Sequence, residues 1–556
     1  MGFTDSDGDA VTLPRTRAVH TTRPTRASKP RLGSPFLLVM REPLFWPLLA
    51  MALLVLAHSA QGIIWPVSRD EGAFLTIAQE VLEGRIPYRD AFDHKSPGIY
   101  YLLAAVMRVL GFLSPFGQIV ALRVITVLCN LGTAWGLVCL GRRWWRLEIG
   151  ILAATLWLLA VPLYEGDFFL TEPFAVLATV WAAYLAARWT GARGALVAGA
   201  LFGLATLFKQ TSVLALPGLI LITAAGISGP LLTERWLRQQ AIGLVAFAAG
   251  AIAPWIFIVA LFAGAGALDP FFDQVVTANF RAPPEPHAEL VTLLTQQVYR
   301  LPLLIFTPLI AVAVALATWL AGPLIGAHQH VTTPMTTPMT KPITMPIAVS
   351  FIVGAPQLLP LITHAFPHYW LLCLPWAALL TAAAVVSVLT VWRRPPSEDS
   401  INHSGTWVRP ALVSLVIAGV LTGGPGQLIG PAPLAAARAN YEKLRQEVAA
   451  GAWIAQQVPP GAKLLVVPAT PAYYYLSQHL PSTTFIYLLP VNTTDELVAK
   501  TSAAIAAEEF AVIVWDQTPS KPQDPRLAAV YGAINLHYQR ISYNADLHLS
   551  LLIPFR

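Results

Sequence analysis

The stretch Gly98-Ile-Tyr-Tyr-Leu-Leu-Ala-Ala-Val-Met-Arg-Val-Leu-Gly111 decides the topology of this chain. A helix that crosses a bilayer needs about 17–25 apolar residues, and this stretch is shorter and carries Arg108. We therefore expect it to form an interfacial helix along the outer membrane surface rather than a span. Residues 66–117 then form one long outer loop.

Most of the remaining chain consists of apolar segments that are long enough to span a membrane. Of its 556 residues, 55% are hydrophobic and only 12% are charged, whereas soluble domains are about 25% charged. We predict a polytopic α-helical membrane protein with about eleven transmembrane helices. The predicted spans are 44–65, 118–140, 149–163, 173–189, 194–208, 211–227, 241–263, 300–322, 345–363, 368–391 and 408–424.

The basic residues support this topology. With the N-terminus inside, the loops after the even-numbered spans return to the cytoplasm, where Lys and Arg are enriched. Arg142, Arg188, Arg238 and Arg393 all fall in such loops. If residues 98–111 crossed the membrane, Arg142 would face outward. The net charge of +6 therefore reports topology in a multi-pass plasma-membrane protein, and it does not indicate nucleic-acid binding.

The composition divides the chain into three parts. Residues 1–43 are basic and rich in Pro, Thr and Ser, which predicts a disordered cytoplasmic tail. Residues 44–424 form the membrane domain, and residues 425–556 form an extracytoplasmic α/β domain. A largely parallel sheet is expected there, because strand-like and helical segments alternate. The expected helices are 434–458, 472–478 and 495–508, and the expected strands are 463–467, 484–488 and 511–516.

Ionisable residues gather in the outer loops. Asp70 and Glu71 directly follow the first span, and His94 and Lys95 follow in the same loop. An ionisable group at membrane depth costs roughly 2.5–3.5 kcal/mol, so such residues indicate a functional site. Further candidates in this and later outer segments are Asp93, Asp167, Glu172, Lys209, His368 and Tyr369.

These residue types fit sugar transfer at an outer membrane surface. Nucleotide sugars are absent there, so the donor would be a polyprenyl-phosphate sugar. A carboxylate, Asp70 or Glu71, would take the acceptor proton, and we expect partial desolvation to raise its pKa. Cationic groups would stabilise the departing phosphate; the candidates are Lys95, Arg123, Lys209 and His368. No cofactor is required. A divalent metal is not expected either, although three acidic loops could in principle hold one.

Several short motifs resemble the GT-C glycosyltransferases, in particular the dolichyl-phosphate-mannose protein mannosyltransferase family and its bacterial aminoarabinose transferase branch. The resemblance covers roughly residues 44–390. It rests on Asp70-Glu71, Gly84-x-x-Pro87-Tyr88-x-Asp90, His94-Lys95-Ser96-Pro97-Gly98, Ala121-Leu122-Arg123, Thr171-Glu172-Pro173 and His368-Tyr369 with Pro375.

The resemblance implies inverting transfer from a polyprenyl-phosphate sugar on the outer face, with Asp70 as the catalytic carboxylate. Lys95 matches the lysine of the family's Lys-Pro-Pro motif, which reads Lys-Ser-Pro here. Asp167 matches the acidic position of the second outer loop by location only. We expect Glu71, Asp167 and His368 to shape the site. Asp93, His94, Glu172 and Tyr369 are expected to contact substrate.

The residues also have simpler interpretations. Asp70 and Glu71 could cap a helix, since acidic residues favour helix N-termini. Lys95 could extend to lipid headgroups, and Arg123 could pair with an outer-loop acid. For the whole chain, a transporter or flippase of lipid-linked sugars is the alternative, and an outer-domain receptor is another. The sugar remains open, as does the acceptor, which could be a lipid, a glycan or a protein.

Overall fold

The computed structural model describes residues 62–189, 191–225, 233–281, 291–292, 294–296, 344–362, 366–392, 431–468, 470–488, 494–517, 525–545 and 548–555. The predicted tail, most of the first predicted span and the predicted spans 300–322 and 408–424 lie outside these residues. Among the described residues, three helices are long and apolar enough to cross a membrane: Pro115–Trp144, Leu147–Tyr164 and Trp236–Gly264. The total of eleven spans stays a prediction.

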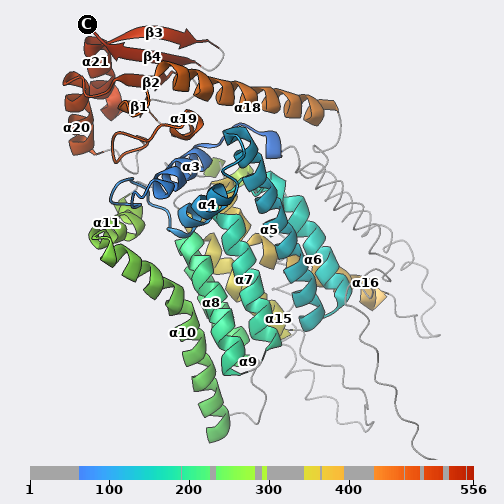
Figure 1. The fold of residues 1–556 in the computed structure, drawn as a ribbon. Helices are drawn as coiled ribbons and strands as arrows, with labels where there is room; N and C mark the ends of the chain where they lie inside the picture. Colours follow the sequence, from blue (N-terminus) through green and yellow to red (C-terminus); the bar gives the residue numbers. More distant parts are fainter. Residues whose placement is uncertain are drawn as a thin grey trace, which may run out of the picture.

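The described membrane helices form a bundle (Figure 1). They coincide in position with predicted spans, although several are shorter than a full span. The helices and the short helical turns between them are α5 (Pro115–Trp144), α6 (Leu147–Ala160), η2 (Val161–Tyr164), α7 (Thr171–Arg188), α8 (Ala192–Phe208), η3 (Gln210–Ala215), α9 (Leu216–Ala225), α10 (Glu234–Gly264), α11 (Leu268–Phe272), η4 (Asp273–Thr277), α12 (Ala278–Arg281), α15 (Thr344–Gly354), η5 (Ala355–Ile362), η6 (Pro367–Leu372) and α16 (Leu374–Trp392).

The first loop crosses one end of this bundle. It contains η1 (Gly62–Ile64), α3 (Arg69–Leu82) and α4 (Gly98–Val109). The stretch that decides the topology is thus a helix of 12 residues, which packs against α3 over the bundle end (Figure 1). Gly98 allows the start of α4 to lie close to the end of α8, because a Cβ on Gly98 would lie 2.6 Å from the carbonyl oxygen of Leu207.

The C-terminal domain contains a mixed sheet, so the prediction of a largely parallel sheet was wrong. The strand order is β1-β2-β4-β3, in which the β1–β2 pair is parallel and the other two pairs are antiparallel. The prediction missed the C-terminal hairpin, whose outer strand β3 is mostly polar and exposed. The elements are α18 (Pro431–Gln457), β1 (Leu464–Val467), α19 (Ala472–Leu476), α20 (Asp495–Ala506), β2 (Val512–Asp516), η9 (Pro525–Leu527), α21 (Ala528–His537), β3 (Tyr538–Asn544) and β4 (Leu549–Pro554).

Residues 484–488, which were expected to be a strand, form an irregular segment with bends outside the sheet. The backbone N–H of Phe92 donates to the carbonyl oxygen of Thr484 over 2.6 Å, and the N–H of Leu488 donates to Pro468 over 2.7 Å. The segment therefore uses its backbone to join the first outer loop to the C-terminal domain.

Alternate residues of the sheet belong to two different cores. In β1, Leu464 and Val466 join a buried cluster that includes Phe74 of α3 and Tyr100 of α4. Leu465 and Val467 join a second cluster with residues of α20 and α21. Because successive side chains of a strand point to opposite faces, one face of the sheet packs on the outer loop. The outer loop and the C-terminal domain thus share one hydrophobic core.

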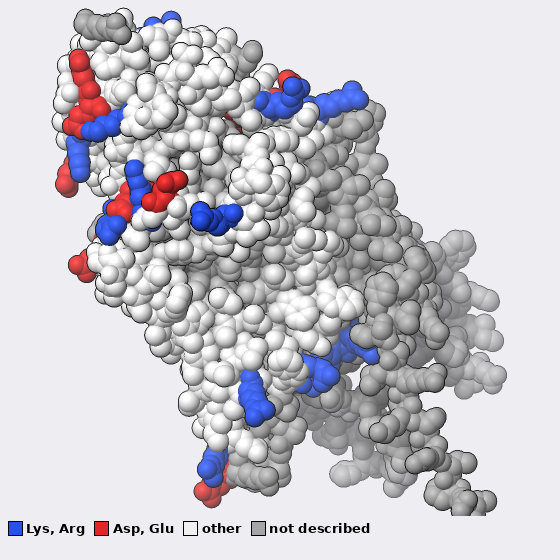
Figure 2. All heavy atoms as spheres, viewed as in Figure 1, with Lys and Arg blue, Asp and Glu red and all other residues white. Residues whose placement is uncertain are grey.

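Charged side chains distinguish the two ends of the bundle. Arg142 and Arg143 end α5, Arg188 ends α7, and Arg193 begins α8. Basic residues accordingly predominate at the lower end of the bundle in Figure 2, where an acidic group is also seen, whereas acidic and basic side chains are mixed above it. Asp70 lies at the opposite end, on α3. This separation agrees with the predicted topology.

Candidate active site

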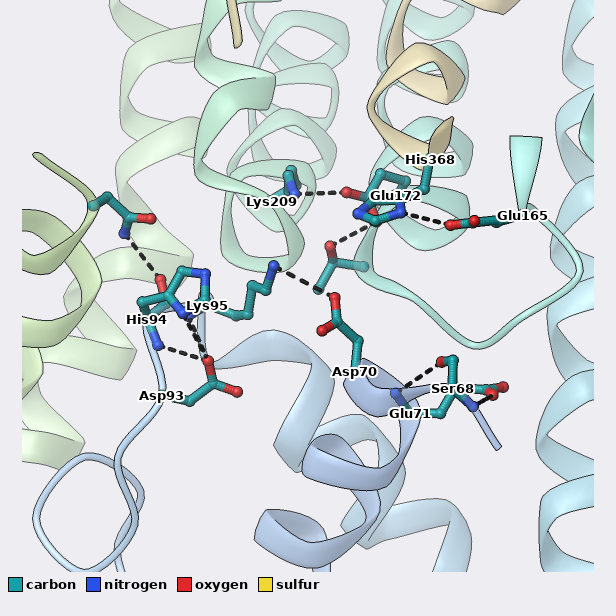
Figure 3. Close-up of polar contacts among 12 residues, drawn as sticks. Ser68, Asp70, Glu71, Asp93, His94, Lys95, Glu165, Glu172, Lys209 and His368 are labelled. Carbon is teal, nitrogen blue, oxygen red and sulfur yellow. Dashed lines mark hydrogen bonds and ion pairs between the residues drawn. The ribbon is translucent and has the colours of Figure 1, made fainter. Parts of the chain in front are cut away.

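The first turn of α3 gives its two carboxylates different surroundings. Ser68 is the N-cap, and its hydroxyl accepts the N–H of Glu71 over 3.2 Å. The Glu71 carboxylate in turn accepts the N–H of Ser68 over 3.0 Å, which completes a capping box. Glu71 therefore has the capping role that the sequence left open. Asp70 points to the other side, toward Lys95 (Figure 3).

Arg123 is fully buried and holds Glu71 in place. Its Nε and Nη2 donate to the two carboxylate oxygens of Glu71 over 3.0 and 2.7 Å. Its other donor contacts reach the backbone carbonyl oxygens of residues 63, 65 and 66. All five N–H donors of the guanidinium are thus engaged. This geometry favours the salt-bridge interpretation of Arg123 over phosphate binding.

Asp70 and Lys95 form the centre of the candidate site. The Lys95 ammonium lies 3.5 Å from an Asp70 carboxylate oxygen; the Lys95 side chain is 10% exposed and the Asp70 side chain 35%. Burial alone would raise the pKa of Asp70, but the positive charge of Lys95, helped by His368, holds this pKa well below its usual range. The expected rise in the pKa of Asp70 was therefore wrong, because desolvation is outweighed by neighbouring cations.

Lys209 and His368 flank this pair from the bundle side (Figure 3). Lys209 lies at the C-cap of α8, where its ammonium pairs with Glu172 over 2.6 Å and lies 4.1 Å from the centre of the Tyr369 ring. The Nδ1 atom of His368 lies 2.9 Å from a carboxylate oxygen of Glu165. Lys209 and His368 also lower the pKa of Asp70, so the structure brings Asp70, Lys95, Lys209 and His368 into one electrostatic neighbourhood.

Asp93 and His94 belong to the turn that carries Lys95. Asp93 is 1% exposed, and one of its carboxylate oxygens accepts the backbone N–H of His94 over 2.6 Å. Burial would raise the pKa of Asp93, but its hydrogen bond with His94 and the nearby positive charge lower it. This placement makes Asp93 a support of the turn rather than a group that is open to substrate.

Asp167 is buried at the entry into the outer loop. It is 6% exposed and lies against Gly62, where an added Cβ would approach within 2.6 Å of the Asp167 Cβ. The structure therefore places Asp167 beside the entry into the outer loop.

Two contributors were not predicted as site residues. Glu165 adopts a left-handed backbone conformation with φ of 60°, and its carboxylate contacts His368. Tyr487 belongs to the C-terminal domain and donates to Asp93 over 3.0 Å. The acidic second loop was a signal for Glu165, but no signal in the sequence links Tyr487 to a residue 394 positions earlier. Within the described residues, no group of three His, Cys, Asp or Glu side chains is arranged to hold a metal ion.

Comparisons with known proteins support the family resemblance. Residues 94–258 match the family described as dolichyl-phosphate-mannose-protein mannosyltransferase. This range begins at His94 and includes Lys95, Glu172 and Lys209. The match supports the resemblance of this part of the chain to mannosyltransferase-like GT-C proteins. No curated protein sequence matches the chain significantly.

Solved structures resemble the whole described fold. ArnT from Cupriavidus metallidurans, bound to undecaprenyl phosphate, superposes with a TM-score of 0.54 at 14% identity over 92% of this chain and 98% of that one. The Archaeoglobus fulgidus oligosaccharyltransferase, tethered to an acceptor peptide, gives 0.53 at 13% identity over 93% and 75%. AglB from the same organism, with an inhibitory peptide and a dolichol-phosphate, gives 0.51 at 12% over 91% and 74%. The chain thus has the GT-C fold of a polytopic helical membrane protein.

Proposed function

We propose that this protein is a membrane glycosyltransferase that moves a hexose or pentose from a polyprenyl-phosphate donor to an acceptor, with Asp70 as general base. The single observation that carries the proposal is the Asp70–Lys95 pair at one end of the bundle, with Lys209 and His368 beside it. A carboxylate next to several cations supplies both groups that such a transfer requires.

The chemistry assigns each group one task. An acceptor hydroxyl attacks the anomeric carbon of the donor, and its proton passes to the Asp70 carboxylate. The bond between the anomeric carbon and the phosphate oxygen breaks, and its electron pair stays on that oxygen. Lys95 and Lys209 stabilise the resulting phosphate, and His368 adds a further donor. The products are the glycosylated acceptor and free polyprenyl phosphate, with inversion at the anomeric carbon.

The lowered pKa of Asp70 predicts that the donor binds before Asp70 removes the acceptor proton. In the free protein, Lys95 holds the Asp70 carboxylate in its ionised form, which makes it a weak base. A donor phosphate that binds to Lys95 brings negative charge and offsets this effect. Asp70 then becomes more basic when the donor is in place, so proton removal is coupled to donor binding.

The fold supports the proposed donor and face. The three solved structures named above contain undecaprenyl phosphate, a tethered acceptor peptide, or a dolichol-phosphate with an inhibitory peptide. We extend the polyprenyl-phosphate class to this chain because its lysines lie where the apolar bundle meets the outer loop. We assign this end to the extracytoplasmic face, because the arginines gather at the opposite end.

Donor consumption tests the proposal. The purified full chain is incubated with a panel of polyprenyl-phosphate sugars and membrane extract, and release of free polyprenyl phosphate is measured. Release that depends on the extract, with the sugar recovered on an extract component, supports transfer. A donor that binds, stays intact and crosses vesicles that contain the protein would instead identify a transporter or flippase. A donor panel that neither reacts nor binds would rule out both the transferase and the transporter.

A further inference from the structure

The turn that carries Lys95 is held by several separate parts of the chain. The carbonyl oxygen of His94 accepts from Gln210 Nε2 and Asn279 Nδ2, each over 3.0 Å. The carbonyl oxygen of Lys95 accepts from the Tyr88 hydroxyl over 2.7 Å. These contacts leave the backbone of the turn little freedom, so the position of the ammonium depends on the turn as a whole.

Asp93 is the internal support of this turn (Figure 3). Its Oδ1 atom accepts the N–H of His94 over 2.6 Å and lies 3.4 Å from the N of Lys95. The backbone N–H of Asp93 donates to Gln274 Oε1 over 3.2 Å. The Asp93 carboxylate therefore holds the N–H side of the backbone from which Lys95 extends toward Asp70, while the contacts named above hold the carbonyl side.

The C-terminal domain reaches this carboxylate through the irregular segment 484–488. The Tyr487 hydroxyl donates to the same Asp93 Oδ1 atom over 3.0 Å, and both side chains are buried. Next to it, the Phe485 ring stacks on Phe92 with ring centres 5.2 Å apart, and Thr484 accepts the N–H of Phe92. The stacking and the backbone bond hold the segment in place without the hydroxyl, so the hydroxyl has a separate effect on Asp93.

We propose that Tyr487 is a positioning residue for Lys95, so that the C-terminal domain completes the active site through the Tyr487–Asp93 hydrogen bond. The inference rests on the proposed function, since it concerns the lysine assigned to the donor phosphate. Without the hydroxyl, the buried Asp93 oxygen loses a donor and the carboxylate can rotate toward its remaining partners. The turn then relaxes, and the Lys95 ammonium leaves the position that stabilises the departing phosphate.

Tyr487→Phe tests this with little change in packing, because it removes one oxygen and keeps the ring. Tyr475→Phe is the matched control. Tyr475 also lies in the C-terminal domain, and its hydroxyl donates to Gln118 of α5 over 2.9 Å, away from the turn. With a saturating donor, we expect Tyr487→Phe to lower kcat about tenfold and to change KM less, since Lys95 acts mainly on the developing phosphate charge. The control should stay near the native rate. Equal losses in both variants would overturn the proposal in favour of general domain docking.

A binding measurement separates positioning from stability and does not need turnover. Affinity for undecaprenyl phosphate in detergent micelles is compared for the native protein, Tyr487→Phe, Lys95→Ala and the double variant. We expect Tyr487→Phe to weaken binding severalfold in the native background and to add nothing once Lys95 is absent. An equal loss in both backgrounds, or no loss in either, would overturn the inference. If the native protein neither binds this lipid nor releases it from donors, the proposed function itself fails.

Discussion

Asp70 and Glu71 are neighbours in the sequence and have unrelated roles in the structure. Glu71 is fully buried, caps its own helix and pairs with Arg123, whereas Asp70 faces Lys95 and remains 35% exposed. The sequence predicted that a functional carboxylate lies in this pair, and the family resemblance selected Asp70. The sequence could not assign Glu71 and Arg123 to each other, because they lie 52 positions apart and meet only in the folded protein.

Arg123→Ala should strongly destabilise the protein, because it leaves the buried Glu71 carboxylate without its partner. Breaking a buried ion pair in this way costs about 3–5 kcal/mol. Arg146→Ala is the control, since Arg146 is 51% exposed and pairs with Glu148 at the surface. Thermal unfolding in detergent measures both. If both variants unfold at the native temperature, the buried pair is not a structural anchor of the outer loop.

The coupling of Asp70 to donor binding predicts a pH effect on the reaction. The acid limb of kcat/KM reports the free protein, in which Lys95 holds the pKa of Asp70 below its usual range. The acid limb of kcat reports the donor complex, in which phosphate offsets Lys95 and the pKa of Asp70 rises. We therefore expect kcat to fall at a higher pH than kcat/KM as the solution is acidified. Coincident limbs would contradict the coupling.

At the scale of elements, the long apolar runs predicted the positions of the described membrane helices, and the packing of these helices depends on small residues that hydropathy does not register. A Cβ on Gly199 of α8 would lie 2.0 Å from the carbonyl oxygen of Phe247 in α10, and one on Gly250 would lie 2.0 Å from that of Leu196. The two helix backbones are therefore in direct contact. The sequence contained these glycines, but nothing in it showed which neighbouring helix they face.

Gly199→Ala should force α8 and α10 apart, since the added methyl group meets backbone that cannot move away. Overpacking of this kind costs about 1–3 kcal/mol. Gly264→Ala, at the end of α10, makes the same chemical change where nothing lies within 4 Å. We expect a lower thermal unfolding temperature for the first variant and a native one for the second. Equal effects would mean that the close contact is not needed.

For the whole molecule, the sequence predicted a membrane part followed by an α/β part but not how closely the two are joined. The outer loop and one face of the sheet share a hydrophobic core, and Glu447 of α18 accepts the N–H of Val67 over 2.9 Å. A pattern of strands and helices cannot reveal such contacts, because they join residues hundreds of positions apart. It also missed the antiparallel hairpin, since the polar edge strand β3 lacks an apolar run.

The burial of Glu447 makes the docked C-terminal domain sensitive to pH. Burial raises the pKa of Glu447 to about 7, above its ordinary value of 4.5. A raised carboxyl pKa stabilises the folded state fully below about pH 4.5, and this stability is lost as the pH rises through 7. As the pH rises between these limits, the free energy of unfolding of Glu447→Gln should fall by about 1–3 kcal/mol less than that of the native protein. Glu442→Gln, exposed on the same helix, should behave like the native protein in thermal unfolding across pH. A native pH profile for Glu447→Gln would contradict the assignment.

The most direct test of the central claim is the rate of polyprenyl phosphate release by Asp70→Asn, measured in a single turnover with the donor already bound. Glu83→Gln is the control, because Glu83 is an exposed carboxylate at the other end of the same helix. Loss of a general base slows such a step about 10²–10⁴-fold. We predict a loss of this size in Asp70→Asn, with donor binding retained and with no loss in the control. Release at the native rate by Asp70→Asn would contradict the claim that Asp70 takes the acceptor proton.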